Sequence, residues 1–220
     1  MRFSLRKLSR IELKYITSPS ASFYESDQRL TFDQYLALRD TGIEGHGELI
    51  NGELFELPPE SGLNVIIASY LFLVFREIGI PFQLIHLGRC EIQTPVLRSG
   101  DAANRFPDLV LLRPEHLPLV QKRLTISLDM PPPRLVVEVV SPGKTSYERD
   151  YMHKRDQYTA VAIPEYWIVN PEEQTVLVLQ LQTGAYTEVG IFKGERSLTS
   201  LEIPQLQLTA AQLFAAGELA

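Results

Sequence analysis

Cysteine is almost absent from this chain, and its scarcity excludes whole classes of protein. Cys90 is the only cysteine among 220 residues, so neither a disulfide framework nor a zinc site built from cysteines is possible. We interpret Cys90, in the strand-like segment RCEIQTP, as a small residue of the core. A lone thiol also suits a reducing compartment, and we expect the protein to be cytoplasmic.

Long hydrophobic runs and short catalytic motifs are missing as well. No apolar run reaches the roughly 18 residues typical of a membrane helix, so we expect no membrane span. The basic start MRFSLRKLSRIELKYITSPS has no apolar segment of the kind found in secretory signals. There is no G-x-S-x-G motif and no phosphate-binding glycine loop. No metal-ligand spacing relates the four histidines, His46, His86, His116 and His153.

The chain also lacks an excess of positive charge. The chain carries 21 Lys and Arg against 27 Asp and Glu, which gives a formal net charge of −6 and a pI near 5.3. A protein that coats DNA by bulk electrostatics would usually be basic. The charge therefore argues against a simple DNA-binding module. It argues less against an enzyme that holds nucleic acid in one local groove with help from metal ions.

The order of hydrophobic patterns predicts a basic arm, residues 1–30, and a single α/β (α+β) domain, residues 31–220, with a mixed central sheet flanked by helices. Asn51-Gly52 is the strongest short hairpin signal. The segment after the hairpin is apolar on almost all sides, which predicts a buried helix. The predicted elements are a helix at 31–40, a hairpin at 47–57, the buried helix at 63–79, strands at 82–87, 89–94, 106–112 and 134–140, a helix from near Ser146, strands at 164–170, 175–182 and 186–192, and a helix at 208–214.

Two acidic residues interrupt otherwise apolar strands. Asp108 lies in RFPDLVLL and Glu138 in RLVVEVV, and burying an ionised carboxylate is costly unless it is paired. If the two strands are neighbours, both side chains meet on one face and repel each other. A divalent cation removes that conflict, since Mg²⁺ often takes one or two carboxylates together with water or phosphate oxygens. The alternative is that each carboxylate is a structural residue paired with an Arg or Lys.

A lysine on the following helix is a candidate partner for these carboxylates. Tyr147, Tyr151, Lys154 and Tyr158 follow one another at spacings of four, three and four, which places them on one stripe of an α-helix. The three tyrosines indicate that this stripe packs inward. Lys154 then either extends along a tyrosine surface toward solvent or points at the carboxylates, where it can orient a water or stabilise negative charge.

Four phrases of the sequence, taken in order, resemble a known family. GELINGELFEL, FPDLVLL, LVVEVVSP and EYWIVNP are similar to the Uma-type restriction endonucleases of the PD-(D/E)XK nuclease superfamily. The likeness runs from about residue 31 to about residue 214. It implies a restriction-endonuclease-like fold and Mg²⁺-dependent hydrolysis of nucleic acid, with Mn²⁺ as a substitute ion and DNA as the expected substrate. A homodimer is a reasonable assembly for cutting two strands.

The resemblance also implies roles for individual residues. Asp108 and Glu138 match the metal-binding acids of the superfamily, and we add the Val139 carbonyl as a further ligand. The superfamily lysine normally lies two residues after the glutamate, where this chain has Val140. In this family the lysine comes from the following helix, and Lys154 matches it.

An additional acidic residue often comes from the N-terminal part of this fold. The segment GELINGEL offers Glu48 and Glu53, and we favour Glu53, just after the hairpin turn, as a catalytic residue. The chain departs from the family at Asn64, where a histidine is common. The main alternative is therefore a non-catalytic nucleic-acid or protein interaction module on the same fold. A two-carboxylate glycosidase is a lesser alternative, because the chain lacks an aromatic-rich sugar platform.

Overall fold

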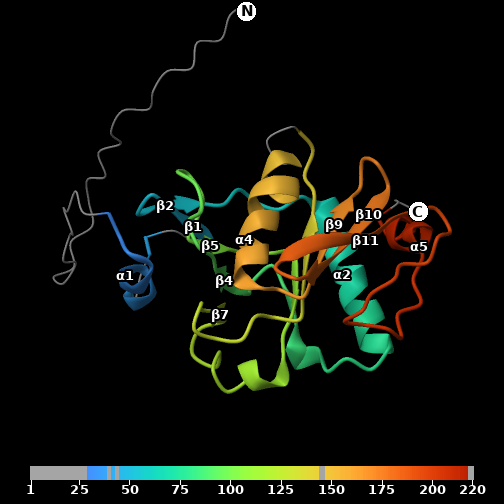
Figure 1. Cartoon of the computed structure of the whole chain (residues 1–220), viewed down its shortest axis with the longest axis horizontal. Helices are drawn as coiled ribbons and strands as arrows, with labels where there is room; N and C mark the ends of the chain where they lie inside the picture. The colour runs from blue at the N-terminus through green and yellow to red at the C-terminus, as the bar shows by residue number, and fades with distance from the viewer. Residues whose placement is uncertain (1–28, 39–40, 43–44, 144–146, 218–220) are drawn as a thin grey trace, which may run out of the picture.

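Figure 1 shows the computed structural model, which describes residues 29–38, 41–42, 45–143 and 147–217. Most of the predicted basic arm lies outside the described residues, as does the predicted helix start at Ser146. Both therefore stay predictions. Within the described part of the chain, no helix is both long and apolar enough to cross a membrane.

A six-stranded mixed sheet forms the central layer. In chain order its strands are β3 (Ile85–Leu87), β6 (Leu109–Leu111), β8 (Leu135–Val139), β9 (Glu165–Asn170), β10 (Thr175–Gln182) and β11 (Ala185–Lys193). Their order across the sheet is β11-β10-β9-β8-β6-β3. β8 and β9 run parallel, and the other neighbouring pairs are antiparallel. Every residue of β8 and β9 is buried, which explains their nearly continuous apolar runs.

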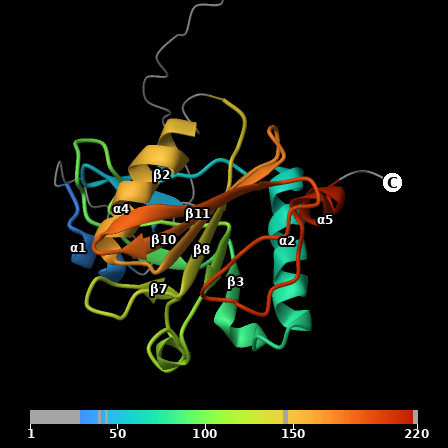
Figure 2. The same cartoon turned by 45° about the vertical axis from the view of Figure 1, so that its right-hand side comes forward.

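Helices cover both faces of this sheet. The α-helices are α1 (Phe32–Ala37), α2 (Gly62–Glu77), α4 (Arg155–Val161) and α5 (Ala210–Ala215). On β9, Trp167 meets Phe75 of α2 edge to face, with ring centroids 6.0 Å apart. The next residue back, Tyr166, points to the opposite face and packs on Tyr158 of α4 at 5.1 Å. Figure 2 shows α2 and α4 on the two sides of the strands, and the predicted fold class is confirmed.

Helix α2 differs from the prediction of a buried helix. Its inner side, which includes Ile67, Leu71 and Phe75, is buried. Its other side exposes large apolar side chains, for example Val65 by 50% and Leu73 by 56%. The helix belongs to an outer layer, so only one of its sides meets the sheet. Apolar composition on all sides therefore did not translate into burial on all sides.

The remaining strands form two small sheets. The predicted hairpin is present as β1 (Gly47–Ile50) and β2 (Glu53–Glu56), and the other sheet contains β4 (Glu91–Gln93), β5 (Asn104–Arg105) and β7 (Thr125–Ile126). Asn51 and Gly52 form the turn with φ of 52° and 82°, as the Asn-Gly signal predicts. The Asn104 side chain joins the sheets, because it accepts from the Leu49 N–H and donates to the Gly47 carbonyl.

The stretch 106–112, predicted as one strand, is shorter and links two sheets. β5 ends just before it, and β6 begins only at Leu109. Pro107 lies between them and has no N–H to give to a strand ladder. Phe106 and Asp108 therefore do not share a strand face: Phe106 stacks on His46, whereas Asp108 faces β8.

Two further elements depart from the predicted pattern. The segment 82–87 starts with a 3₁₀ turn, η1 (Phe82–Leu84), and only its second half joins the sheet as β3. A second 3₁₀ turn, η2 (Pro114–His116), follows β6. The helix after β8 contains a π-helical segment, η3 (Arg149–Lys154), that continues into α4.

The π turn modifies the predicted stripe of tyrosines and lysine. Lys154 and Tyr158 are buried as expected, and Tyr151 is half-buried. Tyr147 is 46% exposed and stacks on Tyr151 with ring centroids 4.0 Å apart. A π-helical turn holds more residues than an α-helical one, so the strict α-helical spacing was correct only for the C-terminal half of the stripe.

Candidate active site

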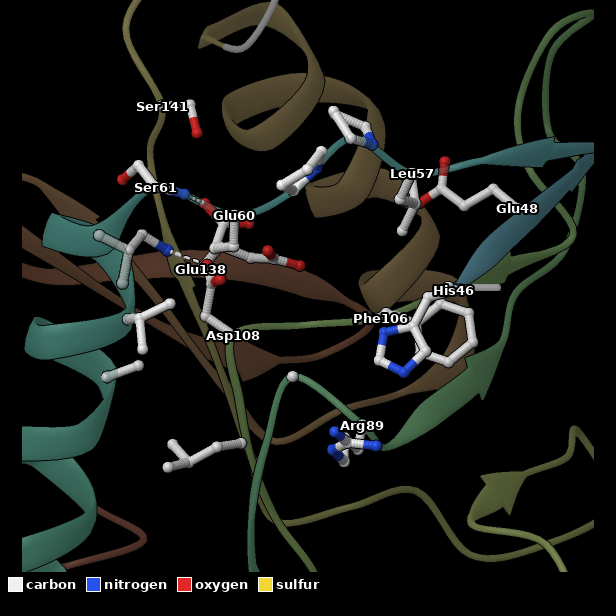
Figure 3. A pocket seen from close by; sticks show the side chains of 18 of the residues that line it. His46, Glu48, Leu57, Glu60, Ser61, Arg89, Phe106, Asp108, Glu138 and Ser141 are labelled. Atoms are coloured by element: carbon white, nitrogen blue, oxygen red, sulfur yellow. Dashed lines mark hydrogen bonds between the residues drawn. The ribbon is translucent and has the colours of Figure 1, made fainter. Parts of the chain in front are cut away.

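A cavity of about 830 Å³ opens where the loop before α2, the ends of β6 and β8, and η3 come together (Figure 3). Its wall carries both acidic and basic side chains. They are Glu48, Glu56, Glu60, Arg89, Asp108, Glu138, Arg149 and Lys154, together with His46. The cavity thus brings together Asp108, Glu138 and Lys154, which come from three separate segments of the chain.

Asp108 and Glu138 lie at corresponding ends of neighbouring strands. β6 pairs with β8 with Leu109 opposite Val137, so the next position places Asp108 opposite Glu138. The Asp108 carboxylate accepts a hydrogen bond of 2.6 Å from the N–H of Val139. Burial, and then the charge of Glu138, raise the pKa of Asp108 well above its usual range. The two carboxylates therefore meet in the electrostatic conflict expected for neighbouring strands.

The carboxylate of Glu138 has two close partners. Lys154 Nζ donates to Oε2 at 2.7 Å, and the Tyr158 hydroxyl donates to Oε1 at 2.6 Å. Burial raises the pKa of Glu138, although Lys154 opposes the effect. Burial alone would lower the pKa of Lys154, but the charges of Glu138 and Asp150 raise it to about 12. Lys154 is therefore a protonated cation directed at Glu138 rather than a side chain extended toward solvent.

Asp150 is a buried acid that the sequence reasoning missed. Its carboxylate lies 3.0 Å from Lys154 Nζ and 3.0 Å from Arg149 Nε. Burial favours a higher pKa for Asp150, but Lys154 and Arg149 outweigh it and lower the pKa below its usual value. The available signal was the spacing of four between Asp150 and Lys154, which suits an ion pair on a helix. Asp150 and Glu138 together fix the position of the lysine ammonium.

The loop before α2 supplies another acid that the sequence reasoning missed. Glu60 lies beside Asp108 and Glu138 in Figure 3, and its charge contributes to the raised pKa of Asp108. The Asn64 amide donates to Glu60 Oε1 at 2.8 Å and to the Val139 carbonyl at 3.0 Å. Asn64 therefore ties Glu60 to the end of β8. Ser61, the N-cap of α2, indicates where the helix starts, but nothing in the sequence indicates that Glu60 and Asn64 reach the end of β8.

The two hairpin glutamates lie in different environments. Glu53 is exposed on β2 and does not line the cavity. Glu48 is buried, lines the cavity and accepts a hydrogen bond from Arg105 at 2.9 Å. The structure therefore brings Glu48, but not Glu53, to the cavity that holds Asp108. Which face of a hairpin meets a cavity depends on tertiary packing, so the sequence could not decide between the two.

The oxygen donors of Asp108, Glu138 and Val139 suit an ion such as Mg²⁺. Within the described residues, no group of three or more His, Cys, Asp and Glu side chains is close enough to hold a metal ion. Asp108 and Glu138 offer two carboxylates and Val139 a carbonyl, and Mg²⁺ commonly takes its other ligands from water or phosphate. The raised pKa of both acids indicates that their ionised forms are poorly compensated. A divalent cation would compensate them, so these residues fit such an ion.

Comparisons with known proteins identify the family. A solved structure from Anabaena variabilis, described as "a putative nuclease belonging to DUF820", is 21% identical in sequence and superposes with a TM-score of 0.60. The match covers 86% of this chain and 99% of that one, and at this identity it shows a shared fold. No curated protein matches the chain. The model of the Uma2 family, described as "Putative restriction endonuclease", matches residues 32–211, and the chain therefore belongs to the Uma2 family.

Proposed function

We propose that this chain is a metal-dependent endonuclease that hydrolyses phosphodiester bonds in nucleic acid, with DNA as its substrate. Asp108, Glu138 and Lys154 would be its catalytic residues. The observation that carries the proposal is a pair of adjacent strand-end carboxylates, both with raised pKa, beside a buried lysine. The description of the family as restriction endonucleases, and of the Anabaena protein as a nuclease, support it.

Asp108, Glu138 and the Val139 carbonyl would hold the ion, either Mg²⁺ or Mn²⁺. When bound, the ion would lower the pKa of a coordinated water and neutralise charge on the scissile phosphate. The Val139 N–H holds the Asp108 carboxylate, and Asn64 holds the Val139 carbonyl, so the protein orients both ligands before any ion arrives. Because the pKa of Asp108 is raised, binding would release a proton and weaken as the pH falls.

Lys154 would act as a cation and not as a base. With a pKa of about 12 it keeps its proton at neutral pH, so it cannot accept one from the attacking water. Its ammonium, held by Glu138 and Asp150, is suited to orient that water or to stabilise negative charge on the phosphoryl oxygens. Glu60 takes the place of Glu53 as the additional acid in this proposal, since it lines the cavity and Glu53 does not.

A non-catalytic interaction module is the second candidate, and a specific observation favours it. Both oxygens of Glu138 are engaged by Lys154 and Tyr158, and the Asn64 amide is already bonded to the Val139 carbonyl. Such a cluster can be part of the folded structure without a metal, since the lysine already compensates the charge of the buried acid.

Metal binding separates the two candidates without knowledge of the substrate. The purified protein is titrated with Mg²⁺ or Mn²⁺ while its melting temperature is followed, alongside Glu138→Gln and Asp108→Asn. Metal at about 100 times its Kd should add roughly 2.7 kcal/mol of stability to the wild type. Neither variant should respond. Glu53→Gln is the matched control, because it removes the same charge outside the cavity and should respond as the wild type does.

Cleavage is then measured on mixed-sequence DNA and on RNA with the responsive ion. Metal-dependent strand breaks that Asp108→Asn abolishes and Glu53→Gln retains would support the nuclease. Metal binding without cleavage of either polymer would favour the interaction module. A melting temperature that no ion changes would remove the basis of the metal-dependent mechanism.

The proposal includes a cytoplasmic homodimer in which each copy cuts one strand of a duplex. The Asp108–Glu138 pair of one copy is one candidate metal site, which supports the cut of one strand. Sedimentation of the protein with and without duplex DNA tests the assembly. A monomer under both conditions would exclude it.

A further inference from the structure

A second cavity, of about 580 Å³, adjoins the candidate active site. The two cavities share part of their walls, namely Gly45, His46, Arg89 and Phe106. Beyond these shared residues the charged side chains of the second cavity are Lys122, Arg123 and Glu91, and Glu91 is paired with Arg123. We call these two adjoining cavities the groove: its wall includes Asp108 at one end, the aromatic pair His46 and Phe106 where the cavities meet, and Lys122 at the other end, in a chain with a net charge of −6.

The aromatic pair is a flat stack at the point where the cavities meet. The rings of His46 and Phe106 are 4.4 Å apart and inclined by only 2°. Both side chains are half-buried, so part of each ring remains open to the groove. His46 directly precedes β1, and its carbonyl accepts from the Leu57 N–H. Phe106 lies two residues before Asp108. The stack is therefore held by backbone on both sides.

Arg89 lies next to this stack, as Figure 3 shows. It is exposed, and among the described residues no ion pair or hydrogen bond engages its guanidinium. The backbone just before Arg89 is tied to the site, because Gly88 donates its N–H to the carbonyl of Asp108 at 3.0 Å. The available cation is thus attached through the backbone to the aspartate of the site. Arg123, in contrast, is already bound to Glu91.

The charge state of His46 suits a stacking surface. Burial, and then the nearby charge of Arg89, lower the pKa of His46, so its ring is neutral at physiological pH. A neutral imidazole on a phenyl ring presents a flat apolar face. Arg89 supplies a positive charge beside this face. Proteins that bind single-stranded nucleic acid use the same two features, since bases stack on their aromatic rings and phosphates contact their cationic side chains.

We infer that this groove holds an unpaired nucleotide next to the scissile phosphate, with its base against the His46–Phe106 stack and its phosphate on Arg89. Lys122 would contact the strand further along the groove. The inference rests on the proposed function and adds the path of the substrate strand. A base inside a duplex has both faces covered by its neighbours, so this contact needs a single strand or a locally opened duplex.

Binding, rather than cleavage, tests the inference. A short fluorescein-labelled DNA strand is titrated with the protein in Ca²⁺, followed by fluorescence anisotropy at several salt concentrations, and a gel then verifies that the strand is intact. The same strand as a duplex, and the RNA of the same sequence, are measured in parallel. The variants are Arg89→Ala, His46→Ala and His46→Phe. Lys193→Ala is the control, since it removes an exposed cation of β11 that lines neither cavity.

Arg89→Ala should weaken binding and reduce the slope of log K against log salt by about 0.7, the value for one phosphate contact to a single strand. His46→Ala should weaken binding by roughly fivefold or more, the lower end for loss of a stacked base. His46→Phe should retain most of the affinity, because it keeps a flat ring. The single strand should bind more tightly than the duplex.

Wild-type affinity in both Arg89→Ala and His46→Ala would overturn the inference, and so would a duplex that binds as tightly as the single strand. A loss in Lys193→Ala equal to that in Arg89→Ala would overturn it too, because it would indicate attraction without a specific groove. Failure of this inference and failure of the nuclease proposal give different results. If the wild type cleaves nucleic acid but the variants bind it normally, only the groove inference is wrong. If the variants lose binding but the wild type does not cleave, only the nuclease proposal is wrong.

Discussion

At Asp108 the protein holds a carboxylate in a place that disfavours its charge. Burial and the neighbouring Glu138 raise its pKa, whereas the Val139 N–H and Lys154 only partly oppose them. The folded state therefore binds a proton at Asp108 more tightly than the unfolded chain does. By linkage, the stability that this group provides is present at low pH and is lost as the pH rises toward the folded pKa.

Asp108→Asn should consequently stabilise the metal-free protein at alkaline pH. An asparagine oxygen can still accept from the Val139 N–H, and the variant carries no charge to bury. In EDTA, the melting temperature of the variant should exceed that of the wild type at pH 8, and the difference should shrink toward pH 4, near the pKa of an unfolded aspartate. A difference that does not change with pH would contradict the raised pKa.

Lys154 is expected to be essential for folding stability as well as for chemistry. Its ammonium is the shared partner of Glu138 and Asp150, both buried. Lys154→Met should cost roughly 3–5 kcal/mol, the usual range when one member of a buried ion pair is removed. Urea denaturation measures the loss.

The double variant Lys154→Met with Glu138→Gln is the control for this prediction. It removes the charge of Glu138, which Lys154→Met leaves without an ion-pair partner, whereas Asp150 keeps Arg149; the double variant should recover part of the stability, which a loss of packing alone would not do. A cost below about 1 kcal/mol for the single variant, as for exposed ion pairs, would mean that the lysine is solvated.

Among the elements, the β1–β2 hairpin is tied to the rest of the fold through its turn. Gly52 has φ of 82°, and a Cβ there would lie 2.4 Å from Arg29 Cβ. Its carbonyl also accepts from the Leu30 N–H at 2.8 Å. Gly184, in the β10–β11 turn, has nearly the same φ of 83° but nothing within 4 Å of a Cβ.

These two glycines make a matched pair of variants. Gly184→Ala should lower the free energy of unfolding by roughly 1–2 kcal/mol, because the only penalty is an alanine in a left-handed backbone conformation. Gly52→Ala should cost more, because it adds a clash with the chain ahead of α1. Thermal or urea unfolding of both variants gives the comparison. Equal losses would show that the chain at Arg29 moves away without cost.

The local signals of the sequence were reliable wherever backbone chemistry decides the structure. The Asn51-Gly52 turn, a helix within the predicted stretch 31–40, and the buried strand around Glu138 are all present. The sequence indicated that Asp108 and Glu138 each need a partner, but left open whether their strands are neighbours, which the pairing of β6 with β8 decides. The Lys154 side chain meets Glu138, one of the two outcomes that the sequence left open for this lysine.

Contacts that depend on the packing of distant segments were not predictable. Glu60 precedes a helix and reaches the site only because Asn64 binds the end of β8. Asp150 turns inward within a π-helical segment; its spacing of four from Lys154 suggests an ion pair on the helix, but not that the pair is buried beside Glu138. The exposure of one side of α2 was not predicted, because the apolar residues around a helix do not indicate which of its sides packs on the sheet.

At the scale of the whole molecule, the sign of the charge limits how nucleic acid can bind. The net charge is −6, and the candidate site adds Asp108, Glu138 and Glu60 to the path of a phosphate. Arg89 and Lys122 provide local attraction along the groove. The balance at the scissile position is negative unless a divalent cation is present.

Divalent cations should therefore strengthen nucleic-acid binding by this protein, in contrast to their usual effect. For a basic DNA-binding protein, added cations compete for the phosphates and lower the affinity. Here Ca²⁺, at constant ionic strength, should raise the affinity of the wild type for a DNA strand by occupying the Asp108–Glu138 pair. In the variant Asp108→Asn with Glu138→Gln the same titration should lower the affinity, because only the competition remains. Fluorescence anisotropy gives both curves, and parallel declines in wild type and variant would mean that the carboxylates hold no ion in contact with the strand.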